Sequence, residues 1–166
     1  MFELQRIEDV SELIAITKSD SGISGPLLAE THIELGKRIA KYMSFPKDDT
    51  TVVALLRGGI FFAQGIYFEL GCSFQLFDPK NEGFKRPKTK NIILVDSVIN
   101  TGNTIEQIYE PDMKVACCVI NEKAVEKFDN NLYTIRTSNN SFIGSDIKIQ
   151  QGNYGPDTTM RLFNAI

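Results

Sequence analysis

Three runs of almost entirely apolar residues constrain the fold of this chain more than any other feature of its sequence. They lie at Thr51–Leu56, Asn91–Val95 and Met113–Ile120. A strand with one face in water alternates apolar and polar residues, whereas a strand buried on both faces reads as a continuous apolar run. Two weaker strand patterns, at Ser73–Phe77 and Leu132–Arg136, accompany them. The runs therefore predict a sheet that is covered on both sides.

Helical patterns separate these strands. The clearest spans Leu27–Met43, with apolar residues on one stripe, and a second spans Ile60–Leu70. Shorter patterns cover Val10–Thr17 and Thr104–Tyr109. Strands that alternate with helices predict an α/β fold, here a single domain over residues 1–166 with a mainly parallel, twisted sheet flanked by helices. Ligands of such sheets bind at the carboxyl ends of the strands.

Composition excludes several classes of protein. The chain has 166 residues and a net charge of −3, which suits one globular domain and argues against a surface that binds nucleic acid. No apolar run approaches the roughly 20 residues that span a bilayer, and the N-terminus does not read as a signal peptide. Its three cysteines, Cys72, Cys117 and Cys118, are typical of buried reduced thiols. We therefore expect a cytoplasmic protein that binds neither membranes nor nucleic acid.

The only histidine, His32, lies on the apolar face of the Leu27–Met43 pattern. A single histidine excludes a multi-histidine metal site and disfavours a serine–histidine triad. Packing between helices is the favoured interpretation of His32, and a binding role is the alternative.

The segment after the Asn91–Val95 run has the composition of an anion site. An acid, Asp96, is expected at the strand tip, and small polar residues follow at 100–104 before the predicted helix. Free backbone N–H groups at a helix N-terminus bind phosphate, and a nearby carboxylate accepts hydrogen bonds from sugar hydroxyls. The alternative is that Asp96 and Thr101 merely cap the helix. Spacing alone does not separate the two.

Resemblance to a known family favours the anion site. Residues 92–104, Ile-Ile-Leu-Val-Asp-Ser-Val-Ile-Asn-Thr-Gly-Asn-Thr, resemble the phosphoribosyl pyrophosphate signature of type I phosphoribosyltransferases. Many members carry two adjacent acids, whereas here Ser97 follows Asp96. Uracil phosphoribosyltransferases also have a single acid at this place, so the resemblance is closest to that branch.

Two further segments resemble the same branch. Val52–Gly59, which ends Leu-Leu-Arg-Gly-Gly, is similar to the family's strand and pyrophosphate loop. Residues 152–163 resemble the tail Gly-Asp-x-Gly-Asp-Arg-x-Phe that reads uracil in the family. Pro156 replaces a glycine of that tail, and Thr159-Met160 replace its second Gly-Asp. These departures leave the identity of the base open.

The resemblance implies an enzyme that transfers ribose 5-phosphate from phosphoribosyl pyrophosphate to a nucleobase, uracil first, with Mg²⁺ carried on the pyrophosphate. It also implies a small hood built from the chain ends, and we expect a homodimer. No side chain is assigned as a direct metal ligand, although Asp157 is a candidate. The implied catalytic residues are Asp96 and Arg57; the implied phosphoribosyl pyrophosphate-binding residues are Arg57, Gly58, Gly59, Lys85, Asp96, Ser97, Val98, Ile99, Asn100, Thr101, Gly102, Asn103, Thr104 and Asp157; the implied base-binding residues are Gln151, Pro156, Asp157 and Thr158.

The polar segment 78–90 is a candidate lid. Residues 80–90 hold five basic side chains against one acid, Glu82, in an acidic protein. Such a run is often only a solvated face, but its position between two expected anion sites also suits closure over a pyrophosphate. We expect its charges to lack internal partners.

A non-catalytic regulator that senses phosphoribosyl pyrophosphate or a nucleotide is the alternative function. The altered tail and the short chain favour it. No DNA-binding module or basic stripe outside the candidate lid supports it.

Overall fold

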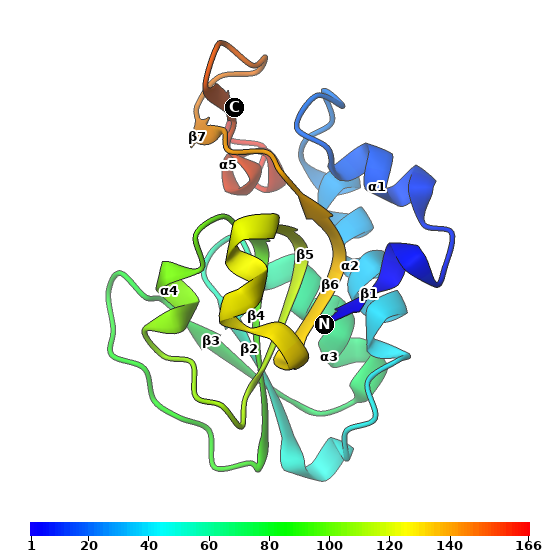
Figure 1. Ribbon diagram of the computed structural model, residues 1–166, viewed down its shortest axis with the longest axis vertical. Coiled ribbons are helices and arrows are strands. Elements are labelled where there is room, and N and C mark those ends of the chain that lie inside the picture. Colours follow the sequence, from blue (N-terminus) through cyan, green and yellow to red (C-terminus); the bar gives the residue numbers. More distant parts are fainter.

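The computed structural model describes all residues, 1–166, and consists of a central parallel sheet between two layers of helices (Figure 1). The sheet has six strands in the order β1-β6-β5-β4-β2-β3, and every pair in it is parallel. A separate two-stranded sheet joins β7 and β8. The strands are β1 Phe2–Glu3, β2 Thr50–Leu55, β3 Ser73–Phe77, β4 Asn91–Ile99, β5 Lys114–Asn121, β6 Leu132–Ser138, β7 Ile143–Ser145 and β8 Tyr154–Pro156; the helices are α1 Ser11–Thr17, α2 Pro26–Ala40, α3 Ile60–Leu70, α4 Asn103–Glu106 and α5 Thr158–Leu162.

Each face of the sheet has its own apolar core. Helices α1, α2 and α3 cover one face, and their cluster includes Phe62 and the inward side chains of β2 and β4, such as Val52 and Val95. The other face is covered by α4 and by a 3-10 segment at Glu122–Lys127, with a cluster that includes Ile105. Successive side chains of a strand point to opposite faces, so the central strands are apolar throughout. The predicted α/β fold with a sheet covered on both sides is confirmed.

The predicted helices and strands lie within a few residues of the observed ones, but the short strands β1, β7 and β8 were not predicted. The end of β4, near the candidate site, differs most. Strand β4 was expected to end at Val95, but it continues to Ile99 because Asp96 and Val98 pair with β5. Its other neighbour, β2, stops pairing at Ala54 opposite Val95. Asp96 is therefore not at the strand tip as expected; it lies inside β4, at the point where one side of the strand becomes free.

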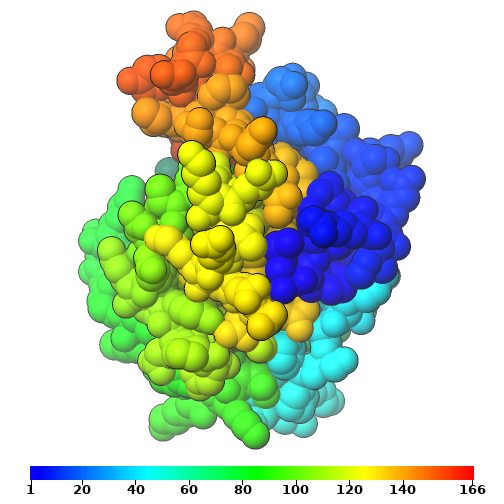
Figure 2. Space-filling model, viewed as in Figure 1, coloured from blue at the N-terminus to red at the C-terminus, as the bar shows by residue number.

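The hood comes mainly from the C-terminal part of the chain. After β6 the chain forms β7 and β8 and then returns to the body through α5, as the orange and red segment at the top of Figure 1 shows. The same segment stands as a separate projection beside the N-terminal residues in Figure 2. Arg161 of α5 fixes the tail to the loop after α1, since its guanidinium donates to the carbonyls of Thr17, Lys18 and Ile23. No helix is both long and apolar enough to cross a membrane.

Candidate active site

One cleft of about 550 Å³ opens beside the carboxyl ends of β2 and β4. Arg57 and Gly58, which follow β2, line it together with Asp96 of β4. The start of the candidate lid, residues 78–81, and the start of α5, residues 157–159, complete its wall. The structure therefore brings the two segments with anion-site character into a single cavity large enough for one sugar phosphate.

Asp96 is the most enclosed acid of this cleft. Its Oδ1 accepts a hydrogen bond of 2.7 Å from the backbone N–H of Ser97. Burial raises the pKa of Asp96 to about 7, and the N–H groups of Ser97 and Val98 act in the opposite direction. The residue keeps part of its surface open to the cleft. Asp96 caps no helix, because Gly102 occupies the N-cap of α4, so the structure contradicts the capping alternative for Asp96.

The turn after β2 brings three parts of the chain together. A Cβ atom on Gly58 would lie 3.2 Å from Oδ1 of Asp96 and 2.9 Å from Oγ1 of Thr159. Only a glycine lets the turn, the acid and the tail approach so closely. Gly59 is buried behind this turn, at the N-cap of α3.

Arg57 is exposed and forms no ion pair. Its guanidinium carbon lies 5.4 Å from the centre of the Phe163 ring. The Leu56–Arg57 peptide bond is cis. A cation at the mouth of the cleft without a carboxylate partner is free to meet an anionic ligand.

The polar loop after β4 lines a smaller hollow of about 200 Å³ that also includes Asp96. Gly102 adopts a positive φ of 77°, and the N–H groups of Thr101 and Gly102 have no acceptor in the protein. Helix α4 was expected to reach Tyr109 but spans only Asn103–Glu106. The helix dipole of so short a segment is small, so the free N–H groups of the loop are the main candidate donors to an anion. The hollow is lined by Asp96, Val98, Ile99, Asn100, Thr101, Gly102, Asn103, Thr104 and Ile105.

The candidate lid has two unlike halves. Its first half contributes Lys80 to the wall of the cleft. In its second half, Arg86 forms ion pairs of 2.7 Å with Glu110 and 2.6 Å with Asp112, so the expectation that these charges lack internal partners is wrong for Arg86. The backbone carbonyl of Lys85 accepts a hydrogen bond from Gln75, and Lys85 lines neither the cleft nor the loop hollow.

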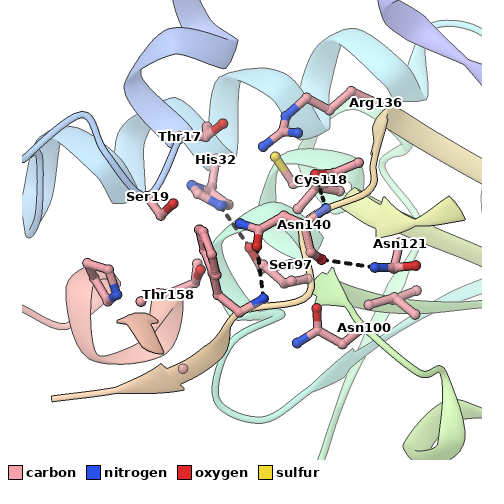
Figure 3. Close-up of a pocket in the computed structure, with 18 residues that line it drawn as sticks. Thr17, Ser19, His32, Ser97, Asn100, Cys118, Asn121, Arg136, Asn140 and Thr158 are labelled. Atoms are coloured by element: carbon pink, nitrogen blue, oxygen red, sulfur yellow. Dashed lines mark hydrogen bonds between the residues drawn. The ribbon is translucent and has the colours of Figure 1, made fainter. Parts of the chain in front are cut away.

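A second cavity, of about 120 Å³, lies between the sheet and the hood (Figure 3). Pro156 and Thr158 line it, and Thr158 also lines the cleft, so the two cavities adjoin. Asp157 lines the cleft instead, where its Oδ1 caps α5 by accepting from the N–H of Met160 at 2.8 Å. Gln151 lies on the exposed end of the hood and lines neither cavity.

Ser97 faces this second cavity, not the acid beside it in the sequence. Its side chain is buried, and Oγ donates 2.8 Å to Nε2 of His32, whose Nδ1 bonds the carbonyl of Leu28. This set of bonds identifies His32 as a neutral imidazole with its proton on Nδ1. Burial lowers the pKa of His32 to about 4, and the nearby Arg161 contributes to the lowering. The helix-packing interpretation of His32 is thus supported, although its ring also borders a cavity.

Sequence reasoning missed the other residues that define this cavity. Arg136 of β6, Asn121 of β5 and Asn140 of the hood line it, and each follows or ends a predicted strand. The rule that ligands bind at the carboxyl ends of parallel strands could have singled out Arg136 and Asn121.

Mg²⁺ fits the cleft as a partner of a bound pyrophosphate. The carboxylates of Asp78, Asp96 and Asp157 line the cleft, but they form no group of three or more side chains placed to hold a metal by themselves. Mg²⁺ is commonly held by one or two carboxylates, water and substrate phosphates.

Comparison with known proteins identifies the fold. No family model matches the chain, and no curated protein matches it in sequence. Among solved structures, the AQ2163 protein from Aquifex aeolicus is 13% identical with a TM-score of 0.59, over 76% of this chain and 81% of that one. A hypoxanthine-guanine-xanthine phosphoribosyltransferase is 14% identical with a TM-score of 0.50, over 70% of this chain and 79% of that one. The orotate phosphoribosyltransferase from Aeropyrum pernix is 16% identical (TM-score 0.50, 67% and 74% covered). The chain has the fold of the type I phosphoribosyltransferases.

Proposed function

We propose that this protein transfers ribose 5-phosphate from phosphoribosyl pyrophosphate to a nucleobase. The observation that carries the proposal is that Arg57 and Asp96 share one cleft, and that Asp96, Val98 and Thr104 of this cleft also line the hollow formed by the loop at 98–104. A cation, a carboxylate and a set of free N–H groups match the pyrophosphate, the ribose hydroxyls and the 5-phosphate of one ligand. The similarity of the fold to phosphoribosyltransferases adds support.

Each group has a distinct role in the proposed reaction. The bond from C1 of the ribose to pyrophosphate breaks and its electron pair leaves with the pyrophosphate. C1 gains oxocarbenium character, and a ring nitrogen of the base forms the new bond to C1 while its proton passes to the solvent. Asp96 accepts hydrogen bonds from the ribose hydroxyls, and Arg57 neutralises charge on the departing pyrophosphate. The loop N–H groups hold the 5-phosphate. Mg²⁺ bound with the pyrophosphate would supply further neutralisation. Positioning and electrostatics by these groups provide most of the proposed catalysis.

Uracil is the first base to test. The tail at 152–163 resembles that of the uracil enzymes, and Pro156 and Thr158 of this tail border the cavity next to the cleft. The carbonyl and N–H groups of such a tail can read the edge of a pyrimidine. A cytoplasmic location and a homodimer remain part of the proposal. Light scattering of the purified protein checks the homodimer.

The test is a pyrophosphate-release assay with phosphoribosyl pyrophosphate, Mg²⁺ and a panel of uracil, cytosine, orotate, hypoxanthine and adenine. Release that depends on one base supports the transferase. Binding of phosphoribosyl pyrophosphate without release for any base would favour the regulator instead. No binding of phosphoribosyl pyrophosphate to the intact protein would overturn both.

A further inference from the structure

Arg136 is the one charged residue that lines the cavity under the hood. The other lining residues supply hydroxyl, amide and thiol groups and a few apolar surfaces, and no Asp or Glu is among them. Arg136 is partly buried and also lines a neighbouring pocket that contains Asp20, but it forms no ion pair with this or any other carboxylate. Such a cation is unusual, because buried charges are normally paired.

The donors of Arg136 are unused. Its Nε is buried and has no hydrogen-bond partner, and neither terminal nitrogen forms a hydrogen bond or an ion pair. In Figure 3 the side chain reaches over the cavity above Cys118 and Asn140. A guanidinium presents a planar set of N–H donors, so the missing partner is a hydrogen-bond acceptor, such as an oxygen, and cannot be another donor.

The neighbouring polar groups do not supply that acceptor. Asn140 uses its Oδ1 to accept from the N–H of Phe142 at 2.8 Å, and its carbonyl accepts from Asn121 at 2.9 Å. Ser97 donates to His32. Asn140 and the buried Ser97–His32 pair therefore use these groups within the protein, and they leave Arg136 open to a ligand.

The size of the cavity indicates the size of that ligand. Its volume is about 120 Å³. A protein cavity of roughly 150 Å³ takes up benzene, so the space suits a single six-membered ring. Phe142 and Pro156 supply apolar surface in its lining, and Ser97, Val98 and Thr158 are shared with the cleft. A ring in this cavity would therefore adjoin a sugar phosphate in the cleft.

We propose that Arg136 makes the cavity selective for a pyrimidine that presents a ring oxygen, as an oxo group or a carboxylate, over one that presents an amino group. This inference rests on the proposed transferase function and names its substrate class. An amino group at the same place would turn its N–H donors toward the guanidinium, and two donors cannot pair.

The experiment measures binding of UMP and CMP, which differ by one oxo or amino group, to the full chain by titration calorimetry. The variants are Arg136→Gln, Arg136→Lys and the control Lys41→Gln, which removes an exposed cation just beyond α2, at the end of that helix away from the hood. Binding of phosphoribosyl pyrophosphate and melting temperature are measured on each. Nucleotide binding needs no turnover, so the result does not depend on the assay of the proposed reaction.

We expect the wild type to bind UMP at least about tenfold more tightly than CMP, from the strength of hydrogen bonds to charged groups. Arg136→Gln should weaken UMP about 10- to 100-fold and reduce the UMP/CMP ratio to within about threefold, because an amide can either donate or accept. Arg136→Lys should keep a smaller preference for UMP, and Lys41→Gln should match the wild type. Orotidine monophosphate should show at least the same dependence on Arg136 as UMP.

An unchanged UMP/CMP ratio in both Arg136 variants would overturn the inference, as would a wild type that prefers CMP. A wild type that binds phosphoribosyl pyrophosphate but neither nucleotide would also overturn it while the proposed function survives. Failure to bind phosphoribosyl pyrophosphate would refute the proposed function itself. If Arg136→Gln strongly lowers the melting temperature, the UMP/CMP affinity ratio of Arg136→Lys decides whether the inference holds.

Discussion

The cleft beside β2 and β4 and the cavity under the hood differ in how they are built. The cleft is formed at the ends of long central strands and at the turns that follow them directly, so residues close in sequence are also close in space. The cavity collects side chains from α2, β5, β6 and the tail, and its roof rests on three-residue strands. The rigid sheet thus positions the part of the site proposed for the sugar phosphate. The hood, which has little secondary structure, covers the part proposed for the base.

This difference has a functional consequence. Groups that bind the sugar phosphate should tolerate little change, because they belong to the sheet. The tail can change without disturbing the sheet, which agrees with its departure from the uracil pattern at Pro156 and Thr159, whereas Arg136 belongs to β6 of the sheet. The following predictions test whether the two regions separate in this way, from the largest expected effect to the smallest.

Loss of the carboxylate in the cleft should have the largest effect. Asp96→Ala removes an acceptor for two ribose hydroxyls, each worth about 1.5–3 kcal/mol, so the affinity for phosphoribosyl pyrophosphate should fall by about two to four decades. Asp96→Asn keeps the shape and one acceptor and should lie at the low end. The melting temperature at pH 8 should not fall, since burial of the ionised group opposes folding. Calorimetry and thermal unfolding on the same protein check both parts; a destabilised variant with normal binding contradicts the assignment.

Arg161→Ala should lower stability but leave binding of phosphoribosyl pyrophosphate nearly unchanged, the opposite of Asp96→Ala. The Arg161 guanidinium donates to Ser21 as well as to three backbone carbonyls, so its loss should lower the free energy of unfolding by about 3 kcal/mol. Denaturant unfolding measures this change, and Lys148→Ala, an exposed cation of the hood, is the control. In the folded fraction, binding of phosphoribosyl pyrophosphate should stay within about threefold of wild type. A larger loss would show that the cleft depends on the hood. Arg161 lies on α5, so a variant that lacks the tail would also lose this anchor. Such a truncation therefore cannot test base binding separately from stability.

The pH dependence of binding sharpens the role of Asp96. Its pKa is raised to about 7, so below that pH much of the free protein carries a protonated Asp96 that must lose its proton to accept from two hydroxyls. Affinity for phosphoribosyl pyrophosphate should therefore rise with pH and level off above about 7, with a change approaching tenfold per unit below it. Asp96→Asn, measured over the same pH range, is the control, because any pH dependence that comes from the ligand phosphates appears in both proteins. Parallel pH profiles for the two proteins would contradict an ionised ribose anchor.

The smallest effect is expected in the candidate lid. Lys80→Gln should weaken binding of phosphoribosyl pyrophosphate by about three- to tenfold, because Lys80 lines the cleft and an exposed charge contact is worth about 1 kcal/mol. Lys85→Gln removes the same charge from the half that lies away from the cleft and should change binding less than about twofold. Equal effects of the two substitutions would indicate that the basic segment attracts the ligand through its overall charge and not through a contact of Lys80 in the cleft.

Local sequence predicted the sheet, but it failed where two strands end at different places. The apolar runs located β2, β4 and β5, the weaker strand patterns located β3 and β6, and Gly71 ended α3 where expected. The end of β4 could not be read from its own residues, because Asp96 and Ser97 look like a turn until β5 is placed beside them. The pairing of charges in the basic segment 80–90 could not be predicted locally either, because the partners of Arg86 lie more than twenty residues away in the sequence.

The sequence by itself determined the α/β class and located the two turns that are proposed to bind anions, because periodicity, glycines and strand-end polar residues act within a few residues of one another. The tertiary structure decided which of these residues share a cavity. It turned Ser97 away from Asp96 to pair with His32, and it brought Arg136 under the hood without an acceptor. The physical reason is that alternation sends neighbouring side chains of a strand to opposite faces, while burial and hydrogen-bond satisfaction depend on elements far away in the chain.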